Sequence, residues 1–199
     1  MLLVKDDHEA VEADLAAGRV GCPGCGGRLA RWGFASEREL RTLGGVRRLR
    51  PRRTMCSSCR VTHVLVPAST VPRLRDTAEV VGSAWQSKVA GAGHRTIARR
   101  LGRPLSTVRR WLRRLGARAE TMRAAATRWL HEFDPAAGPD GPTASPLADA
   151  LEALGRAAAA TSRRLGPRPP WEVAVILTGG LVASPARRAV VKGGPGAVP

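Results

Sequence analysis

The four cysteines of this chain form two C-x-x-C pairs, and this spacing constrains the fold more than any other feature. The pairs are Cys22–Cys25 and Cys56–Cys59, and no cysteine is left over. Two residues between thiolates let one tight turn aim both sulfurs at one ion, and two such turns complete a tetrahedral shell. Because a shell of four protein sulfurs has no open position, we expect one structural Zn²⁺ per chain, bound by Cys22, Cys25, Cys56 and Cys59.

Other uses of these cysteines fit the sequence less well. Disulfides need an oxidising compartment, and residues 1–20 lack the basic start and apolar core of a secretory signal. A thioredoxin-type redox site needs a single C-x-x-C beside a βαβ pattern, which is missing. His63 follows Cys59 by four residues, but four cysteines already satisfy a zinc ion, so we do not expect it to be a ligand.

The basic charge is concentrated in the middle of the chain. The formal net charge is +17, of which residues 21–60 carry +8 and residues 61–118 carry +10. Residues 1–20 carry −3 and residues 119–199 carry +2. A field of this sign favours a polyanion, and nucleic acid is the commonest one in a cell. We expect a soluble, cytoplasmic, nucleoid-associated protein with neither a membrane partner nor a small-molecule substrate.

The first third of the chain predicts a short helix followed by a zinc ribbon. Apolar residues recur with helical spacing from His8 to Ala17, so we assign residues 1–20 to a leading helix. The 30 residues between Cys25 and Cys56 exceed the usual spacing of a four-cysteine finger, so we expect a β-hairpin excursion there. Residues 21–68 form the expected ribbon, with strands over 29–34, 39–43, 46–55 and 62–66 and a turn at Gly44-Gly45.

The second strand of the expected hairpin is rich in arginine. Side chains of an extended strand point alternately to both faces, so at least one face of this run is a candidate phosphate contact. The expected contacts are Arg47, Arg48, Arg50, Arg52 and Arg53.

A linker over residues 69–75 precedes a helical segment, 76–133, that contains a helix-turn-helix pattern. Gly102 stands where a left-handed residue closes the first helix, and Pro104 prevents that helix from continuing. We expect Ser106 or Thr107 to cap the second helix. Apolar residues recur at helical spacing in both helices: Ile97, Ala98, Leu101, Val108, Leu112 and Leu115. We place Trp111 in the core rather than on a stacking surface.

The exposed face of the second helix has the chemistry to read DNA in the major groove. Arginine pairs bidentately with guanine O6 and N7, so Arg109 and Arg110 are the expected base readers. Arg113 and Arg114, one turn later, are expected at phosphates. The full set of expected contacts on the two helices is Arg95, Arg99, Arg100, Ser106, Thr107, Arg109, Arg110, Arg113 and Arg114. A different interpretation of the pattern is an arginine-rich helical hairpin with a solvated charged face.

The remaining chain predicts less structure. We expect a Pro/Gly-rich linker over 134–146, a helical extension over 147–183 and a disordered tail over 184–199. The expected fold is therefore small α+β: an N-terminal zinc ribbon, an all-α helix-turn-helix domain and a weakly structured helical C-terminal tail.

Two sets of motifs resemble known proteins. The sequence around Cys22-Pro-Gly-Cys25 and Arg31-Trp32-Gly33, with Arg52–Cys59 and Thr62–Pro67, resembles the zinc-finger head of insertion-sequence transposases. Together with Gly91–Ala98 and Ser106–Arg114, it is similar to an uncharacterised family of high-GC bacteria that joins such a ribbon to a helix-turn-helix. The resemblance covers about residues 8–125. It implies DNA binding in a mobile-element context and no assigned reaction.

The expected function is that of a zinc-stabilised protein that binds double-stranded DNA, either a transcriptional regulator or a mobile-element-associated factor. A homodimer would require paired half-sites. A transposase core needs a larger α/β domain with converging carboxylates, and only 84 residues follow Leu115, so we expect no enzyme activity. The alternatives are a truncated or accessory transposase component without a catalytic core, and an RNA- or protein-interaction module.

Overall fold

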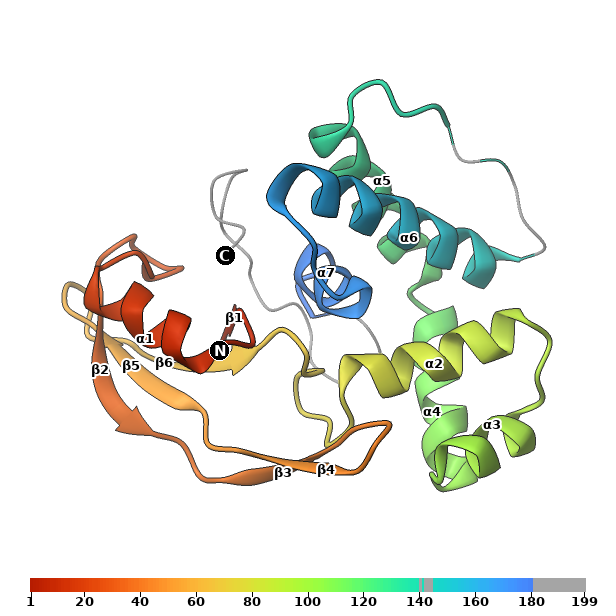
Figure 1. Cartoon of the computed structure of the whole chain (residues 1–199), viewed down its shortest axis with the longest axis horizontal. Helices are drawn as coiled ribbons and strands as arrows, with labels where there is room; N and C mark the ends of the chain where they lie inside the picture. Colours follow the sequence, from red (N-terminus) through yellow and green to blue (C-terminus); the bar gives the residue numbers. More distant parts are fainter. Residues whose placement is uncertain (140, 142–144, 181–199) are drawn as a thin grey trace.

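Two hydrophobic cores organise the chain, one beneath the N-terminal strands and one among the helices (Figure 1). The computed structural model describes residues 1–139, 141 and 145–180. Six strands and seven helices lie within this part of the chain, with the strands and the first helix preceding the other six helices. The structure thus has the small α+β composition expected from the sequence.

The N-terminal sheet has four strands in the order β1-β6-β5-β2. These are β1 (Leu2–Val4), β2 (Leu29–Phe34), β5 (Arg52–Cys56) and β6 (Thr62–Pro67). Strand β1 pairs in parallel with β6, whereas β6 with β5 and β5 with β2 are antiparallel. The leading helix expected from His8 to Ala17 is confirmed as a helix over His8–Ala16, but the assignment of residues 1–20 missed β1. A strand of three residues is too short to show a periodic pattern.

Helix α1 (His8–Ala16) covers the sheet. The Asp7 side chain accepts a hydrogen bond from the backbone N–H of Ala10 at 3.0 Å, which caps the first turn. Val11 and Leu15 are buried against the sheet in the smaller core, which also contains Cys22 and Cys56. One cysteine of each pair is therefore part of the packing of this region, while Cys25 and Cys59 are exposed.

The hairpin between the cysteine pairs forms a separate two-stranded sheet of β3 (Arg38–Arg41) and β4 (Val46–Leu49). The expected single strand over 46–55 was wrong, because β4 ends at Leu49 and β5 begins at Arg52 in the other sheet. Pro51 lies at the break. Proline has no N–H to donate to a ladder, so a central strand cannot run through it.

The segment expected as a linker, 69–75, is partly buried. Thr70 and Val71 have almost no exposed surface, and Val71 belongs to the helical core. Thr70 also forms an isolated bridge with Thr77. The connection between strands and helices is therefore packed, which the prolines in the sequence do not reveal.

Three helices follow, α2 (Ala78–Val89), α3 (His94–Leu101) and α4 (Leu105–Gly116). Gly102 ends α3 with a left-handed backbone, φ 61°, as expected. The expected cap at Ser106 or Thr107 was wrong: the cap position is Pro104, two residues before Ser106, and α4 begins at Leu105 with no side-chain cap. Proline disfavours a helical backbone for the residue before it, so the helix cannot begin before Pro104.

Helices α5 (Ala119–Phe133), α6 (Pro146–Leu165) and α7 (Pro170–Leu177) complete the helical core. Two indole N–H groups connect helices of this core. Trp85 of α2 donates to the Leu147 carbonyl of α6 at 2.9 Å, and Trp129 of α5 donates to the Leu177 carbonyl of α7 at 3.2 Å. The helical extension expected over 147–183 is confirmed by α6 and α7, but these helices pack in the core and are not weakly structured. The tail expected to be disordered, 184–199, lies outside the described residues. No helix in the described part of the chain is long and apolar enough to cross a bilayer.

Gly82 and Gly155 provide a matched test of this packing. A Cβ atom at Gly82 in α2 would lie 2.1 Å from Trp171 of α7, whereas one at Gly155 in α6 would meet nothing within 4 Å. We expect Gly82→Ala to lower the free energy of unfolding by about 1–3 kcal/mol through overpacking. Gly155→Ala should raise it by up to about 1 kcal/mol through helix propensity. Chemical denaturation followed by tryptophan fluorescence measures both, and equal effects would contradict the α2–α7 contact.

Candidate metal centre and basic helix face

The two cysteine pairs lie in backbone turns of the same design. In each, the residue four positions after the first cysteine donates its N–H to that cysteine's carbonyl: Gly26 to Cys22 at 2.8 Å and Arg60 to Cys56 at 3.1 Å. Both donors have a left-handed backbone, with φ 75° and 62°. The repeated turn gives the two pairs equivalent shapes, so that both can direct their sulfurs to one point.

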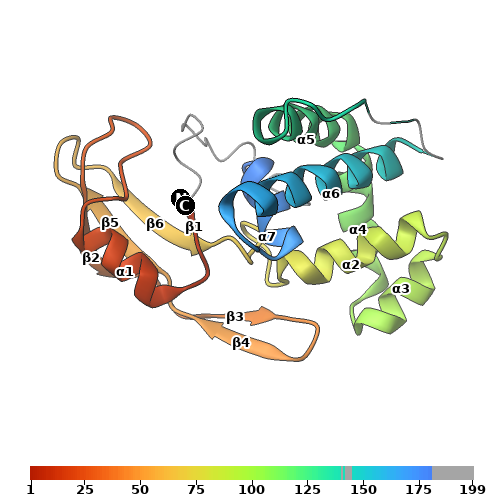
Figure 2. The same ribbon diagram turned by 45° about the horizontal axis from the view of Figure 1, so that its top comes forward.

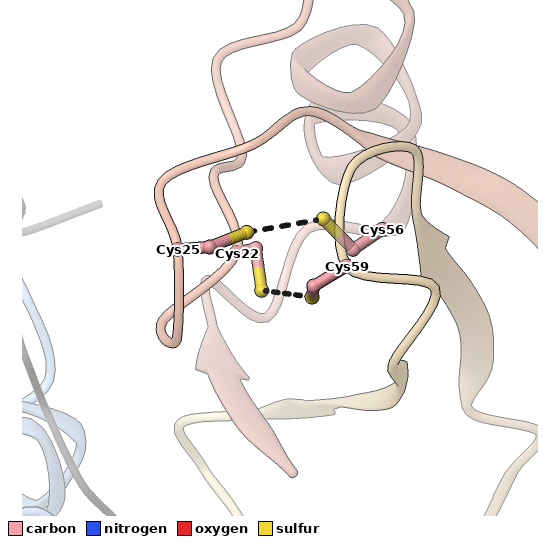
Figure 3. A group of neighbouring side chains, drawn as sticks. All are labelled: Cys22, Cys25, Cys56 and Cys59. Carbon is pink, nitrogen blue, oxygen red and sulfur yellow. Dashed lines mark hydrogen bonds between the residues drawn. The ribbon is translucent and has the colours of Figure 1, made fainter.

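The four sulfurs lie together in Figure 3. The Sγ atoms of Cys22 and Cys59 are 3.7 Å apart, those of Cys25 and Cys56 are 3.5 Å apart, and all four lie within 4.8 Å of one another. A disulfide would bring two sulfurs to about 2.05 Å. Tetrahedral zinc with Zn–S distances of about 2.3 Å separates its sulfurs by about 3.8 Å. The geometry therefore fits one metal ion.

Backbone N–H groups, burial and neighbouring sulfurs shift the pKa values of Cys56 and Cys59. The backbone N–H of Cys59 is the largest influence on Cys56 and helps to lower the pKa of that thiol to about 6. The N–H of Val61 alone would lower the pKa of Cys59. The opposite effect comes from contacts with neighbouring sulfurs, that of Cys25 first, and from burial. Together they outweigh the Val61 N–H and raise the pKa of Cys59 to about 12. A bound cation would stabilise all four thiolates together, because it offsets their mutual repulsion.

His63 lies beside the sulfur cluster rather than within it. Its Nε2 is 3.4 Å from the Cys22 Sγ, and the group of four potential ligands does not include it. Burial lowers the pKa of His63, which favours the neutral ring. A neutral imidazole can donate one N–H to the sulfur and so support the charge of a Cys22 thiolate.

Two of the expected DNA contacts on the ribbon are engaged within the protein. Arg47 donates to both carboxylate oxygens of Asp6, at 2.9 and 3.2 Å, and to the Ser69 hydroxyl at 2.8 Å. This pairing raises the pKa of Arg47. Arg52 is half-buried and donates to Glu12 at 2.6 Å. These two side chains join α1 and the chain start to the strands, so their positive charges are already neutralised by carboxylates of the protein.

The Glu12 carboxylate shows how strong this internal pairing is. Burial alone would raise its pKa, but the hydrogen bond and charge of Arg52, with the charge of Arg31, outweigh burial and lower it. The other expected ribbon contacts, Arg48, Arg50 and Arg53, are exposed. The Arg50 guanidinium lies 4.9 Å from the centre of the Phe34 ring.

The largest unbalanced charge lies on α3 and α4. Residues 80–119 contain no aspartate or glutamate. Over the same range the chain carries ten basic residues: Lys88, Arg95, Arg99, Arg100, Arg103, Arg109, Arg110, Arg113, Arg114 and Arg118. Within the described residues, Arg95, Arg99, Arg109, Arg110 and Arg113 are exposed and form no ion pair.

Helix α4 has one buried and one basic face. The buried face consists of Val108, Trp111, Leu112 and Leu115, which confirms the expected core position of Trp111. Ser106 is exposed beside the arginines, while Thr107 and Arg114 are half-buried. Burial, followed by the charge of nearby arginines, lowers the pKa of Arg114. On α3, Arg100 donates a hydrogen bond to Ser87 of α2. On α4 the exposed Arg109, Arg110 and Arg113 lie away from the buried face, and the neighbouring helix α3 adds the exposed Arg95, Arg99 and Arg100.

Sequence reasoning missed a buried carboxylate that joins the strands to the helices. The side chain of Asp76 is only 3% exposed and lies between two guanidinium groups. Arg41 of β3 and Arg103 of the α3–α4 turn each donate to it at 2.6 Å. Arg103 also donates to the carbonyl of Thr42 in the hairpin at 3.3 Å. No local pattern signals such an interaction, because its partners are 35 and 27 residues from Asp76.

A family model for a domain of unknown function, DUF6431, matches residues 22–111. The match begins at the first cysteine and ends within α4, so it includes the sulfur cluster, the hairpin and α3. Searches of curated proteins and of solved structures found no match. The match agrees with the expected likeness to an uncharacterised family, while the likeness to a transposase stays a prediction.

Gly27 and Gly24 allow a test of the metal centre. A Cβ at Gly27 would lie 2.4 Å from the Ser58 hydroxyl and 3.0 Å from the Cys56 sulfur, whereas one at Gly24 would lie 3.8 Å from the nearest sulfur. We expect Gly27→Ala to weaken metal binding by about tenfold or more, because it displaces the second cysteine turn. Gly24→Ala should bind nearly as the wild type. Competition with a chromogenic chelator measures both affinities, and equal values would contradict the close approach.

Replacing Asp76 tests the link between strands and helices. Asp76→Asn leaves the largely buried guanidinium of Arg103 and the partly exposed guanidinium of Arg41 without their counter-charge, so we expect the free energy of unfolding to fall by about 2–4 kcal/mol. Asp134→Asn is the control, because its partner Arg163 is exposed and such pairs contribute about 1 kcal/mol or less. Urea denaturation measures both variants. A loss at Asp76 no larger than that at Asp134 would show that the link is dispensable.

Proposed function

We propose that this protein binds double-stranded DNA through α3 and α4, which act as a helix-turn-helix with α4 in the major groove. The observation that carries the proposal is the basic face of these helices. Its exposed arginines have no acidic partner among the described residues, whereas Arg47 and Arg52 of the ribbon have close ones. Cations left unpaired on one surface attract a polyanion and release its counterions on binding.

The dimensions and chemistry of α4 support this assignment. A helix with side chains is about 10–12 Å across, close to the width of about 12 Å of the major groove. Arg109 and Arg110 lie in the first half of α4, from which side chains of a recognition helix reach base edges. Arg113, Arg114 and the arginines of α3 then contact phosphates, which position the protein on the duplex.

We propose zinc as the ion of the four-cysteine centre and a structural role for it. A tetrahedral set of four thiolates is typical of zinc or iron, and the closed set leaves no position for substrate. Cys56 ends β5 and is buried with Cys22 in the smaller core, while Cys25 and Cys59 are exposed. Zinc would therefore stabilise the ribbon and, through it, the hairpin between the cysteine pairs.

We propose a binding role rather than catalysis. Among the described residues, the four cysteines are the only group of three or more potential metal ligands, so no carboxylate cluster for a nuclease is found there. Several carboxylates pair with basic side chains instead: Asp6, Glu12, Asp14, Asp76, Glu120 and Asp134. Roles in transcription or with a mobile element, in either case as a monomer or a homodimer, remain compatible with this surface.

Variants of α4 test the proposal. Sites are first selected from a random duplex pool with the full-length, zinc-loaded protein. We expect Arg109→Ala and Arg110→Ala each to weaken binding to the selected duplex by roughly 5- to 150-fold and to relax base preference, because each removes a bidentate pair. Arg128→Ala on α5, exposed on a different helix, is the control.

Salt dependence and a competitor decide the remaining alternatives. Affinity should fall steeply with added salt, since phosphate contacts release counterions. Single-stranded RNA should compete poorly against duplex DNA. Wild-type affinity and base preference in both arginine variants would refute groove reading by α4, and better competition by RNA would favour an RNA-binding module.

A further inference from the structure

The β3–β4 hairpin leaves the N-terminal sheet and extends toward the helices. In both views its free end points to the part of the molecule where α3 and α4 meet (Figures 1 and 2). Its two strands pair only with each other, from Arg38 opposite Leu49 to Arg41 opposite Val46. The hairpin is therefore an arm beside the proposed DNA-reading helices rather than part of the ribbon sheet.

Hydrogen bonds hold this arm in a defined place. The N–H of Arg41 donates to the Arg75 carbonyl at 2.6 Å, and the N–H of Thr77 donates to the Arg41 carbonyl at 3.0 Å. The Arg103 guanidinium contacts both Asp76 and the Thr42 carbonyl. Arg103 precedes the first residue of α4 by two positions, at most about 7 Å along the chain. The arm is thus fixed relative to the start of α4.

The tip of the arm is narrow and apolar. Leu43 is 52% exposed and Val46 is 62% exposed, on either side of Gly44-Gly45. A Cβ at either glycine would meet no atom of the described residues within 4 Å, so no described residue covers this turn. Behind the tip, the Arg48 side chain is 76% exposed, and its nearest carboxylate, that of Glu37, is 3.9 Å away and also exposed. Such a contact is weak and gives way readily to a phosphate.

We propose that this hairpin is a wing whose tip enters the minor groove of DNA beside the major-groove site of α4. The proposal rests on the proposed function of α4. A minor groove about 6 Å wide accepts small apolar side chains as a wedge, and Leu43 and Val46 are such side chains. Successive grooves on one face of B-DNA lie about half a helical turn, roughly 17 Å, apart. In this proposal the tip, which begins one residue after the Thr42 that Arg103 contacts, occupies the groove next to that of α4, and the exposed Arg48 contacts its phosphate edge.

Inosine substitution separates the two grooves experimentally. Replacing guanine by inosine removes the 2-amino group from the minor groove and leaves O6 and N7 in the major groove. The selected duplex is therefore prepared with inosine·cytosine pairs either in the flank or in the core site. With full-length, zinc-loaded protein, we expect flank substitution to change affinity by about three- to tenfold and core substitution to have little effect.

Tip variants assign the flank effect to the hairpin. The double variant Leu43→Ser, Val46→Ser should bind the selected duplex about five- to tenfold more weakly and lose its response to flank inosine. Leu165→Ser, an exposed leucine at the end of α6, is the control and should retain both. If the double variant fails to fold, the inosine series on the wild type decides alone.

The outcomes distinguish the wing from the helix. If flank inosine has no effect on the wild type, or the tip variant keeps wild-type affinity and flank response, while Arg109→Ala still weakens binding, the wing is wrong and groove reading by α4 stands. If the wild type does not bind duplex DNA at all, both proposals fall.

Discussion

The buried Asp76 carboxylate is the interaction on which the arrangement of this protein depends. An isolated carboxylate in the interior would be strongly destabilising, and here the charges of Arg41 and Arg103 offset that cost. Arg41 belongs to the hairpin and Arg103 to the turn before α4. The Asp76 carboxylate therefore holds the hairpin and the turn in a fixed relative position. If one partner moved away, it would leave a buried charge without its counter-charge, which is strongly destabilising. The ion pair therefore favours this one arrangement of the hairpin and the turn.

Charge pairing also separates structural arginines from those available to a ligand. Acidic residues near the chain start, Asp6 and Glu12, neutralise Arg47 and Arg52 on the strands. The helices α3 and α4 lie within a stretch that contains no acidic residue. The composition does not distinguish these arginines from one another. In the structure, some pair with carboxylates and stabilise the fold, while others have no acidic partner and can attract a polyanion.

Local signals in the sequence predicted local structure well. The cysteine spacing predicted the sulfur cluster, and Gly102 with Pro104 predicted the turn between α3 and α4. Long-range contacts left no such signal: neither the pairing of β1 with β6 nor the contact of Trp171 with Gly82 follows from periodicity. Asp76 was one acid among many in the sequence, because its importance comes from partners that only the fold brings to it.

The pairing of β1 with β6 has a consequence for the order of assembly. Leu2 pairs with Leu65, so the edge of the sheet cannot form until more than sixty residues of chain have been made and brought back. Closing so long a loop is entropically unfavourable and slow. Metal binding at the cysteines would close the intervening chain first and shorten the effective loop. With an ion bound at the cysteines, a newly made chain would acquire its metal before its first strand pairs, and metal supply would then affect the rate of folding as well as the stability.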